Sequence, residues 1–484
     1  MITLNNIING EIPNGGADGG TVHGTGTTGP AQATLPFFDP ATGVQLGTAP
    51  DSDAATVDRA FQAARTAFKS YKRTTPAERQ AMMLKLADLI EANVDRILEA
   101  EVACTGKPKA VTREIEILRG ADQLRFFAGA CRVVSGTAQT EYVTGFSSTV
   151  RREPLGVVAQ ITPWNYPFMM AIWKIGPALA AGNTLVLKPA DTTPWSTVIL
   201  GELAQQAYPA GVVNIVCGGR GTGAAMVDHE IPEMVSITGS TRAGAQVMSA
   251  ASATLKDVHL ELGGKAPAIV FADVDIELTA KEIALGAFFN AGQDCTAVTR
   301  VLVEESVHAE FGAALAAAAS ALTVGGDAAD LGPLNSAAQL DRVEGFMSRL
   351  PANAKVLAGG KRTGAGFHFE PTVIDGVFQS DEVVCDEIFG PVVTVQPFRS
   401  EEEALELANG TKYALASSVW SNNHGVVTRV SNELDFGAVW INCHQVIPAE
   451  APHGGFKHSG TGKDLSVFGL EDYTRIKSVT TSHR

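Results

Sequence analysis

Cys295 lies in a stretch whose composition suits a reactive thiol. The stretch reads Asn290-Ala-Gly-Gln-Asp-Cys-Thr-Ala297, in which Gly292 gives the backbone freedom and polar side chains surround the cysteine. A buried structural cysteine is the ordinary alternative, because cysteine is among the most buried residue types. Whether this thiol is reactive therefore depends on which other reactive groups accompany it in the chain.

Two further stretches supply such groups. Glu261 ends a strand-like run, 258–262, and enters a Gly-Gly turn, so its carboxylate projects from a strand end. Asn165 follows an apolar strand and lies in the turn Thr162-Pro-Trp-Asn-Tyr-Pro-Phe168. A nucleophile, a carboxylate base and an amide donor at strand ends are the components of acyl chemistry. The ordinary alternatives are a salt bridge for Glu261 and a turn-stabilising role for Asn165.

The residue before the cysteine carries the wrong charge for activating a thiol. A thiol attacks as the thiolate, and free cysteine has a pKa near ~8.5, so Cys295 needs backbone N–H groups or a cation nearby. Asp294 works against this, because a neighbouring carboxylate favours the protonated thiol. We therefore assign Asp294 a substrate-facing or structural role.

In this order, the three stretches resemble the aldehyde dehydrogenase superfamily. The resemblance extends from about Asp39 onward and includes four further motifs, namely Lys188-Pro189, Gly239-Ser-Thr241, Glu387-Ile-Phe-Gly-Pro391 and Pro452-His-Gly-Gly-Phe-Lys-His-Ser-Gly460. Each motif alone is a weak signal, but their common order is specific. The resemblance implies an NAD-dependent enzyme that oxidises an aldehyde to a carboxylic acid.

The resemblance also implies the catalytic roles. Cys295 attacks the aldehyde carbon to give a thiohemiacetal, and the amide of Asn165 with the backbone N–H of Cys295 holds the oxyanion. Losing one such donor typically costs ~10²–10³ in rate. Glu261 activates the water that hydrolyses the thioester. Relatives that pass the acyl group to coenzyme A or phosphate usually lack this carboxylate, so its presence favours a free acid.

The same comparison assigns the cofactor residues. Lys188 ends a parallel strand, where such folds bind ligands, and is placed to reach the adenosine ribose. Asp191, where the family often has Glu, keeps a charge that repels a 2′-phosphate and favours NAD over NADP. Gly239 and Ser240 open a helix whose free N–H groups can receive a pyrophosphate.

The remaining cofactor residues surround the nicotinamide by resemblance. Glu387 corresponds to the carboxylate that holds the nicotinamide ribose, and Phe389 packs beside the ring or, alternatively, in the core. The predicted set is completed by Thr162, Trp164, Gly221 and Leu262.

Within the superfamily, the closest resemblance is to the bacterial γ-aminobutyraldehyde dehydrogenases of putrescine breakdown. The motifs are Arg125-Phe-Phe-Ala-Gly129, Gly292-Gln-Asp-Cys-Thr-Ala297, His453-Gly-Gly and Gly469-Leu-Glu-Asp-Tyr473. They imply a cationic ω-aminoaldehyde substrate, with 4-aminobutanal the best candidate. Betaine aldehyde dehydrogenase is the nearest alternative, and it usually has an apolar residue where Asp294 stands.

Five residues are candidates for binding the ammonium group or the alkyl chain of such a substrate. Asp294 lies beside the nucleophile, and Glu114 and Glu116 lie on a helix that borders the substrate entrance in relatives. Trp173 and Trp440 can face the alkyl chain or the cation. Alternatively, the acids are ordinary solvated charges in a protein of net charge −15.

Bulk properties exclude several other classes. With 484 residues, 45% of them hydrophobic, the chain can form two or three domains. The net negative charge and the lack of basic runs argue against nucleic acid. The sequence has no basic leader and no apolar run near the ~20 residues of a membrane span, so we expect a soluble, cytoplasmic protein. Six scattered cysteines predict reduced thiols, and neither they nor His444, His453 and His458 have metal-ligand spacing, so no metal is expected.

The elements follow from hydrophobic periodicity. Helical patterns cover 54–68, 76–100 and 112–133, with further helices at 194–208 and 241–254. Short apolar runs between helices predict parallel, doubly wound sheets. The first set is 156–162, 183–188, 212–217, 234–238 and 258–262; the second is 267–272, 301–304, 394–397, 417–420 and 438–442.

The predicted fold class is therefore α/β, with two doubly wound parallel-sheet domains and a small β arm for oligomerisation. We place a Rossmann-like NAD-binding domain at 1–136 and 157–262, a catalytic domain at 263–450, and the arm at 137–156 and 465–484. The arm contains non-helical segments at 137–152 and 473–481. Because these would expose unpaired strand edges in a monomer, we expect a homodimer or a homotetramer.

Two features need a separate interpretation. The Gly/Thr-rich segment 14–34 reads as a surface loop, and its formal G-x-G-x-x-G at 24–29 is rejected as a dinucleotide fingerprint because prolines follow it at once.

The alternative to an enzyme is a catalytically silent binding protein of the same fold, which could lose Cys295 or Glu261 without cost to packing. Both are present together with Asn165, which favours the enzyme.

Overall fold

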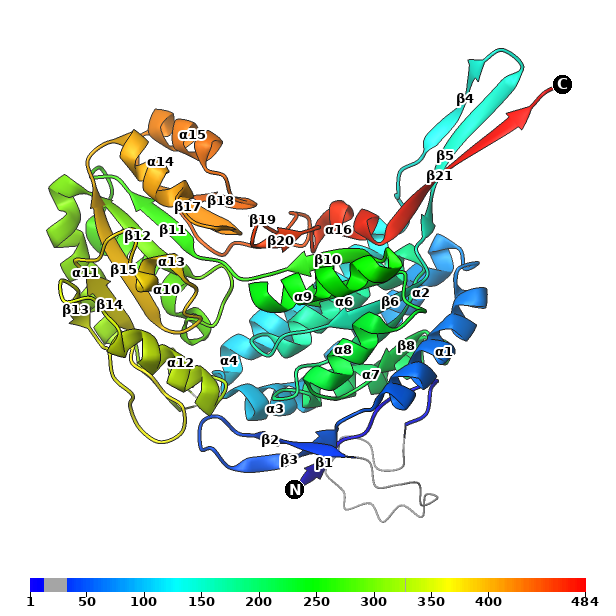
Figure 1. Cartoon of the computed structure of the whole chain (residues 1–484), viewed down its shortest axis with the longest axis horizontal. Helices are drawn as coiled ribbons and strands as arrows, with labels where there is room; N and C mark the ends of the chain where they lie inside the picture. The colour runs from blue at the N-terminus through cyan, green and yellow to red at the C-terminus, as the bar shows by residue number, and fades with distance from the viewer. Residues whose placement is uncertain (13–32, 327) are drawn as a thin grey trace.

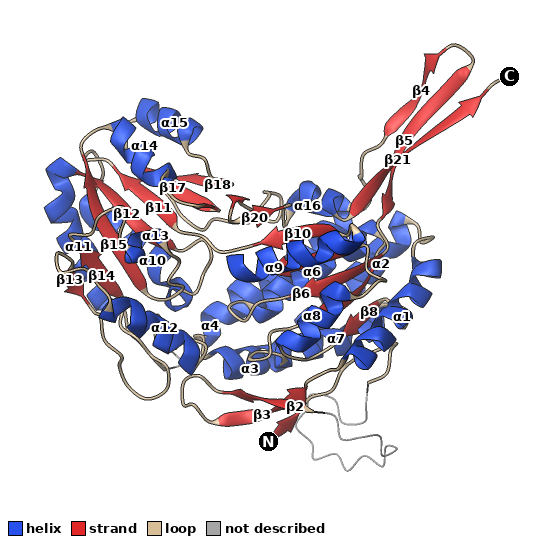
Figure 2. Cartoon of the chain, viewed as in Figure 1, coloured by secondary structure: helices blue, strands red, loops and turns tan. Residues whose placement is uncertain are grey.

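The computed structural model describes residues 1–12, 33–326 and 328–484. In this part of the chain two α/β units lie side by side, and a β arm projects from one of them (Figures 1 and 2). The predicted fold class, with two parallel sheets and a small β arm, is confirmed. Residues 14–32 of the predicted surface loop, including the glycine pattern at 24–29, lie outside the described residues.

The first unit is built on a six-stranded sheet in the order β20-β10-β9-β6-β7-β8. Five strands run parallel, and β20 pairs antiparallel with β10. The strands are β6 (Val157–Ile161), β7 (Thr184–Lys188), β8 (Val213–Ile215), β9 (Met234–Thr238), β10 (Asp257–Glu261) and β20 (Gly460–Thr461). The five parallel strands agree with the predicted runs to within a few residues. The sequence does not predict β20, a two-residue strand that returns from near the C-terminus.

Helices cover both faces of this sheet, as its fully apolar strands require. One face packs against α1 (Ala54–Tyr71), α8 (Arg220–Asp228) and α9 (Thr241–Ala251). The other packs against α6 (Pro167–Ala181) and α7 (Trp195–Ala207), with α2 (Pro76–Ala92), α3 (Val94–Thr105) and α5 (Arg119–Ala130) outside them. Because side chains alternate along a strand, Leu185 and Leu187 join the second cluster while Val186 joins the first.

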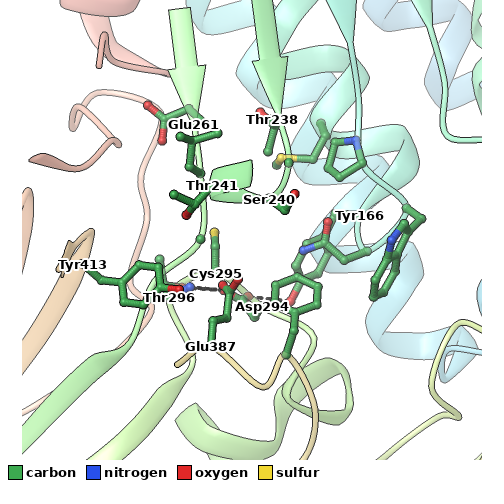
Figure 3. A pocket seen from close by; sticks show the side chains of 18 of the residues that line it. Tyr166, Thr238, Ser240, Thr241, Glu261, Asp294, Cys295, Thr296, Glu387 and Tyr413 are labelled. Atoms are coloured by element: carbon green, nitrogen blue, oxygen red, sulfur yellow. Dashed lines mark hydrogen bonds between the residues drawn. The ribbon is translucent and has the colours of Figure 1, made fainter. Parts of the chain in front are cut away.

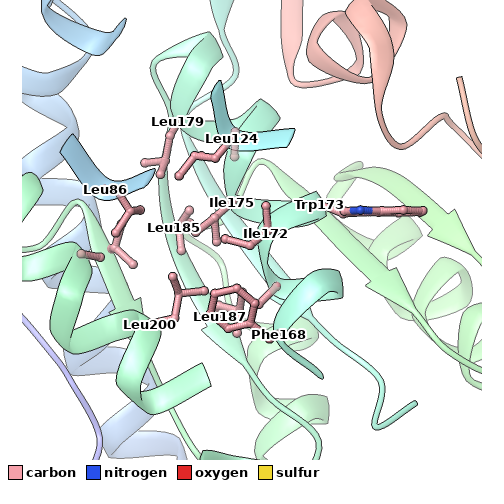
Figure 4. Packing of buried hydrophobic residues seen from close by; sticks show 14 of the residues in the cluster. Leu86, Leu124, Phe168, Ile172, Trp173, Ile175, Leu179, Leu185, Leu187 and Leu200 are labelled. Carbon is pink, nitrogen blue, oxygen red and sulfur yellow. The ribbon is translucent and has the colours of Figure 1, made fainter. Parts of the chain in front are cut away.

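Helix α6 separates this core from the site. Figure 4 shows Ile172, Ile175 and Leu179 of α6 pointing toward Leu86 and Leu185, whereas Trp173 points to the opposite side of the helix. The helix is apolar almost all round and fully buried, so its sequence alone does not show which face meets the cavity.

The second unit is built on a seven-stranded sheet in the order β13-β14-β15-β12-β11-β17-β18, parallel except for β13. Its strands are β11 (Ala266–Val270), β12 (Val298–Glu304), β13 (Lys355–Ala358), β14 (Thr372–Asp375), β15 (Val392–Phe398), β17 (Ala416–Trp420) and β18 (Ala438–Ile441). One face packs against α10 (Ile276–Phe288) and α11 (His308–Ala321), the other against α14 (Glu401–Asn409) and α15 (His424–Glu433). The sequence does not predict β13 and β14, which have only four residues each; three of the four in β13 are exposed.

The arm is a three-stranded antiparallel sheet in the order β21-β5-β4. Its strands are β4 (Thr137–Val143), β5 (Phe146–Pro154) and β21 (Thr474–Ser482), so the predicted strand at 473–481 is confirmed. The prediction that the arm resumes at residue 465 is wrong. Residues Ser466–Asp472 form helix α16, which packs on α5 and α6 through the buried Leu470, and the chain leaves the first unit only after Tyr473.

Two helical predictions also need correction. The pattern at 76–100 is two helices, because the backbone at Asn93 (φ −117, ψ 21) leaves the helical region between α2 and α3. The helix at 112–133 begins with a π-helical turn, Arg113–Leu118, before α5. The other elements are β1 (Ile2–Thr3), β2 (Thr34–Phe38), β3 (Gln45–Pro50), α4 (Lys109–Thr112), α12 (Ala337–Ser348), α13 (Glu382–Cys385), β16 (Tyr413–Ala414) and β19 (Phe456–Lys457). No helix in the described ranges is long and apolar enough to cross a bilayer.

Candidate active site

A cavity of about 910 Å³ lies where the carboxyl end of the first sheet meets the second unit. Strands β9 and β10 end here side by side, with Thr238 paired to Glu261, and Figure 3 shows both residues above Cys295. The predicted residues that line this cavity are Asn165, Cys295, Glu261, Trp164, Gly239, Ser240, Leu262, Glu387, Phe389, Asp294 and Trp173. The fold therefore brings all three predicted catalytic residues to one space.

The loop before Cys295 has an unusual backbone. Asn290, Ala291 and Gly292 are consecutive left-handed residues, with φ of 51°, 54° and 67°. A side chain at Gly292 would collide with the backbone of Gly390, so only glycine fits there. For the two non-glycine residues this conformation costs roughly 1–2 kcal/mol each. The surrounding contacts must offset that strain.

Those contacts join the two units. The Asn165 amide donates to the carbonyl of Gln293 at 3.0 Å, and Asn290 donates to the carbonyl of Asn165 at 3.0 Å. The Gln293 side chain in turn donates to the Pro333 carbonyl at 3.2 Å and accepts from the Asn335 N–H at 2.8 Å. One N–H of Asn165 thus holds the nucleophile loop, which leaves its second N–H to donate elsewhere.

The Cys295 thiol is held in its neutral form. Burial raises its pKa well above the ordinary value, and the negative charges of Asp294, Glu261 and Glu387 raise it further. This agrees with the expectation that Asp294 opposes thiolate formation. The neutral thiol is therefore the resting species at neutral pH.

Asp294 has a structural position in the cavity wall. One carboxylate oxygen accepts from the backbone N–H and the hydroxyl of Thr296, each at 2.7 Å, and the other accepts from the Tyr166 hydroxyl at 2.7 Å (Figure 3). A carboxylate offers about four acceptor sites, so these three bonds leave room for one more donor from the cavity.

Glu261 is buried and only loosely held. Its side chain is 4% exposed, and its Oε1 has no hydrogen-bond partner among the described residues. Burial raises its pKa well above the ordinary value, and the charge of Asp464 adds to this, while Lys174 and Lys463 oppose it. A side chain at Gly454 would collide with the same oxygen, so this glycine leaves the space that the carboxyl group occupies.

A second carboxylate, Asp464, lines the same cavity. It is 1% exposed and forms an ion pair with the fully buried Lys174, whose Nζ lies 3.0 and 3.2 Å from its two oxygens. Sequence reasoning missed this pair, because Lys174 lies in an apolar helix and Asp464 lies in a loop nearly 300 positions later.

Several of the predicted cofactor residues meet on one side of the cavity. Ser240 caps α9 by accepting from the Ala243 N–H at 3.2 Å, and the first N–H groups of this helix have no partners within it. Glu387 accepts from the Gly264 N–H at 2.9 Å, and burial raises its pKa to about 7. Phe389, with φ of 61°, packs edge-on to Trp164 at 5.3 Å.

Four predicted cofactor residues do not line this cavity. Lys188 is buried and donates to the carbonyls of Pro189 and Gly218 at 2.8 and 2.9 Å; Thr162 is also buried, and Asp191 and Gly221 are exposed. They nevertheless lie along the same sheet edge, because Lys188 pairs with Ile161 at the ends of β7 and β6. That is the position where a cofactor extending from the cavity would end.

Three predicted substrate residues do not reach the cavity. Glu114 is 64% exposed and 3.1 Å from Arg113. Glu116 is buried beneath the wall, where it forms an ion pair with Lys107 at 2.8 Å and burial raises its pKa to about 8. Trp440 donates to the Val446 carbonyl at 3.0 Å outside the lining. Both glutamates lie in the π-helical turn Arg113–Leu118, in which Glu114 faces solvent and Glu116 is buried against Lys107.

Several lining residues were missed by sequence reasoning. On the substrate side they are Tyr166, Met169, Met170, Thr296, Ile447 and His453. His453 packs edge-on to Trp173 at 5.1 Å, so the two rings form one aromatic wall. The methionines and Trp173 share one face of α6, which is the only signal the sequence offers for them. Within the described ranges no group of three or more His, Cys, Asp or Glu could hold a metal.

The aldehyde dehydrogenase family model matches residues 28–479 of this chain. The chain belongs to the aldehyde dehydrogenase family. The curated protein DhaS of Bacillus subtilis is 39% identical over 457 residues, which are 92% of each chain. The NAD⁺ complex of an aldehyde dehydrogenase from Bacillus cereus is 37% identical with a TM-score of 0.92, covering 99% of this chain and 96% of that one. A betaine aldehyde dehydrogenase variant from Staphylococcus aureus is 34% identical with a TM-score of 0.94, covering 100% and 96%.

This aldehyde dehydrogenase uses NAD, in agreement with the NAD⁺ complex of its relative. The residues present fit that cofactor. The open N-terminus of α9 can receive the pyrophosphate, and Glu387 at the cavity floor can accept from ribose hydroxyls.

We expect Asp294→Asn to speed alkylation of Cys295 by iodoacetamide at neutral pH by about tenfold, the effect of one pKa unit. Removing the neighbouring charge lowers the thiol pKa, so more thiolate forms at a given pH. In both proteins labelling should accelerate as the pH rises toward that pKa. The measurement is mass-spectrometric labelling of the Cys295 peptide against pH.

Tyr166→Phe is the matched control, because it removes the hydrogen bond to Asp294 but leaves the charge. It should not shift the labelling midpoint downward. An unchanged midpoint in Asp294→Asn would show that this carboxylate does not set the thiol pKa.

Proposed function

We propose that this aldehyde dehydrogenase oxidises its substrate to a carboxylic acid through a thiohemiacetal and then a thioester on Cys295. The observation that carries the proposal is the convergence of Cys295, Asn165 and Glu261 on one cavity beside the open N-terminus of α9. NAD accepts the hydride when it is bound. The product is a free acid because Glu261 supplies a base for hydrolysis.

Each of the three residues has a separate role in the reaction. Cys295 forms the covalent bond to the substrate carbon, and its proton must leave as it attacks. The free N–H of Asn165 and the Cys295 N–H are the donors for the oxyanion. Burial raises the pKa of Glu261 well above its ordinary value, so its carboxylate is a stronger base toward water than an exposed glutamate would be.

We expect Cys295→Ala to abolish dehydrogenase turnover while NAD still binds, since the cofactor contacts lie elsewhere. Glu261→Gln should give a burst of one NADH per site and then a steady state ~10²–10⁴-fold slower, because acylation precedes the step that needs the base. Rapid-mixing absorbance of NADH measures both. Full steady-state turnover in either variant would contradict the assignment.

We further propose that the substrate is an ω-aminoaldehyde, with 4-aminobutanal the best candidate. Support comes from the motifs shared with γ-aminobutyraldehyde dehydrogenases and from the position of Asp294 in the cavity wall, with one acceptor site free. Trp173 and Tyr166 line the same space and can contact a cation for about 0.5–2 kcal/mol. Glu114 and Glu116 no longer support this assignment, since neither reaches the cavity.

Betaine aldehyde is the second candidate. The aromatic wall of Trp173 and His453, with Tyr166 in the same cavity lining, suits a quaternary ammonium as well as a primary one. A quaternary ammonium has no N–H, so it cannot donate to the free acceptor site on Asp294.

The decisive comparison is 4-aminobutanal against butanal and betaine aldehyde. We expect kcat/KM to favour 4-aminobutanal over butanal by about tenfold or more, and Asp294→Asn to narrow that gap, because the carboxylate acts on the ammonium. Equal efficiency for 4-aminobutanal and butanal would remove the aminoaldehyde assignment. A preference for betaine aldehyde that survives in Asp294→Asn would support the second candidate.

We propose that the enzyme is a homodimer or a homotetramer assembled through the arm. All seven residues of β4 are exposed, and Tyr142, Val143 and Ile476 are 71%, 63% and 66% exposed on a three-stranded sheet that projects from the first unit. Such a sheet leaves unpaired edges and apolar side chains that a second subunit can cover. Light scattering at micromolar protein should give a dimer or a tetramer, and a single monomeric species would refute assembly.

A further inference from the structure

Three buried charged groups form a cluster behind Tyr166. Lys107, Glu101 and Glu116 are 7%, 0% and 2% exposed, and none of them lines the catalytic cavity, whereas Tyr166 does. Glu101 lies on α3, Lys107 follows that helix, and Glu116 lies in the π-helical turn after it. Tyr166 is therefore the cavity residue through which this cluster can act on a substrate.

A chain of contacts joins the cluster to the cavity wall. Lys107 Nζ lies 2.8 Å from Glu116 Oε1 and 4.2 Å from the centroid of the Tyr166 ring. A cation over the face of an aromatic ring is attracted to it, so the ammonium group holds the ring. The hydroxyl of the same ring donates to Asp294 at 2.7 Å. Lys107 thus has a carboxylate on one side and the ring that orients Asp294 on the other.

The cluster has two carboxyl groups for one ammonium group. Oε1 of Glu101 accepts from the Phe168 N–H at 3.2 Å. Oε2 of Glu101 and Oε2 of Glu116 have no hydrogen-bond partner among the described residues. With Lys107 charged, the cluster has no net charge when one carboxyl group is protonated and a net charge of minus one when both are ionised.

The change between these two states falls in an accessible pH range. Burial raises the pKa of Glu116 to about 8, Lys107 opposes the rise, and Glu101 adds to it. A carboxyl group is protonated below its pKa and ionised above it, so the cluster becomes more negative as the pH rises through this value. Burial raises the pKa of Tyr166 well above its ordinary value, and the negative charges of Asp294 and Glu116 add to this. The phenol therefore stays protonated and keeps its bond to Asp294 while the cluster changes charge.

A charge of this kind distinguishes cationic from neutral ligands. At a separation of ~10 Å and an effective dielectric constant of ~20, one unit charge changes the affinity for a cation on the order of tenfold. A neutral aldehyde in the same cavity feels no comparable change. The effect needs no contact between the cluster and the ligand.

We propose that the buried cluster of Lys107, Glu101 and Glu116 selects for cationic aldehydes from behind Tyr166, and that the selection strengthens when the cluster loses a proton. The inference rests on the proposed aminoaldehyde substrate. Asp294 meets the ammonium group directly, whereas Glu116 acts on it through the wall. The three residues of the cluster determine specificity without touching the substrate.

The test measures the electrostatic potential at Cys295 without turnover. The probes are 2-(trimethylammonium)ethyl methanethiosulfonate, which has a fixed positive charge, and the neutral 2-hydroxyethyl methanethiosulfonate. Each forms a mixed disulfide with the thiolate and releases methanesulfinate. The ratio of their rate constants, from mass spectrometry of the Cys295 peptide, cancels the fraction of thiolate. The full-length enzyme is labelled at low salt, at about pH 6.5 and about pH 9.5.

We expect Glu116→Gln to leave the cation-to-neutral ratio unchanged at the lower pH and to reduce it by about fivefold or more at the higher pH. Glutamine keeps an acceptor for Lys107 but cannot ionise. Glu261 and Glu387 line the cavity and also have raised pKa values, so part of the rise in wild type belongs to them. Comparing two proteins at the same pH removes that part.

A second variant removes the same charge from the other carboxyl group. Glu101→Gln keeps an acceptor for the Phe168 N–H and should give the same loss at the higher pH. Glu114→Gln is the matched control, because Glu114 lies in the same turn as Glu116 but is 64% exposed and paired with Arg113. It should keep the wild-type ratio at both pH values.

A wild-type ratio at the higher pH in both Glu116→Gln and Glu101→Gln would overturn the selection. An equal fall at both pH values would also overturn it, because a displaced ring would lower the ratio at any pH. Neither result touches the proposed function, since labelling needs no aldehyde and no NAD. Equal oxidation of 4-aminobutanal and butanal would instead remove the aminoaldehyde assignment, whatever the labelling ratio.

Discussion

Burial of the reactive groups is the constraint on which the rest of this enzyme depends. Cys295, Glu261 and Glu387 all have raised pKa values because the cavity separates them from bulk water. The same burial strengthens every dipole directed at the substrate. It also disfavours the ionised forms of the thiol and of the two carboxyl groups. Asp464, the carboxylate of the buried ion pair with Lys174, lines the same cavity.

A second constraint is that the site is shared between two units with separate cores. Cys295 is held on the second unit and Asn165 on the first, and hydrogen bonds between Asn165, Asn290 and Gln293 fix their relative position. These bonds also compensate for the left-handed backbone before Cys295. A shift between the units would therefore separate Asn165 from the loop that carries Cys295 before it unfolded either core.

The sequence predicted most of the regular strands and few of the loop residues that reach the site. Short, uninterrupted apolar runs such as β6 and β7 were recognisable because a strand buried on both faces is apolar at nearly every position. Cys295, Glu261 and Asn165 were predicted from their motifs, and two of these motifs stand at the ends of such strands, since Glu261 is the last residue of β10 and Asn165 follows β6. Asp464 and His453 were not, because their loop returns to the site across the whole chain. Glu116 was assigned to the substrate entrance by resemblance, and nothing local in the sequence shows that it forms a buried ion pair with Lys107 instead.

The arm and the active site share a boundary that the sequence did not predict. Helix α16 packs on α6 through Leu470. The two residues that follow the helix have different surroundings. Tyr473 is buried, its hydroxyl donates to Ser236, and its carbonyl accepts from Asn183 at 2.9 Å, while β21 begins at Thr474. The chain thus passes directly from Tyr473, which is hydrogen-bonded in the core of the first unit, to the strand that projects into solvent. Because tightly packed interiors transmit small displacements, a displacement of β21 at Thr474 would reach Tyr473 and the Ser236 hydroxyl that it contacts.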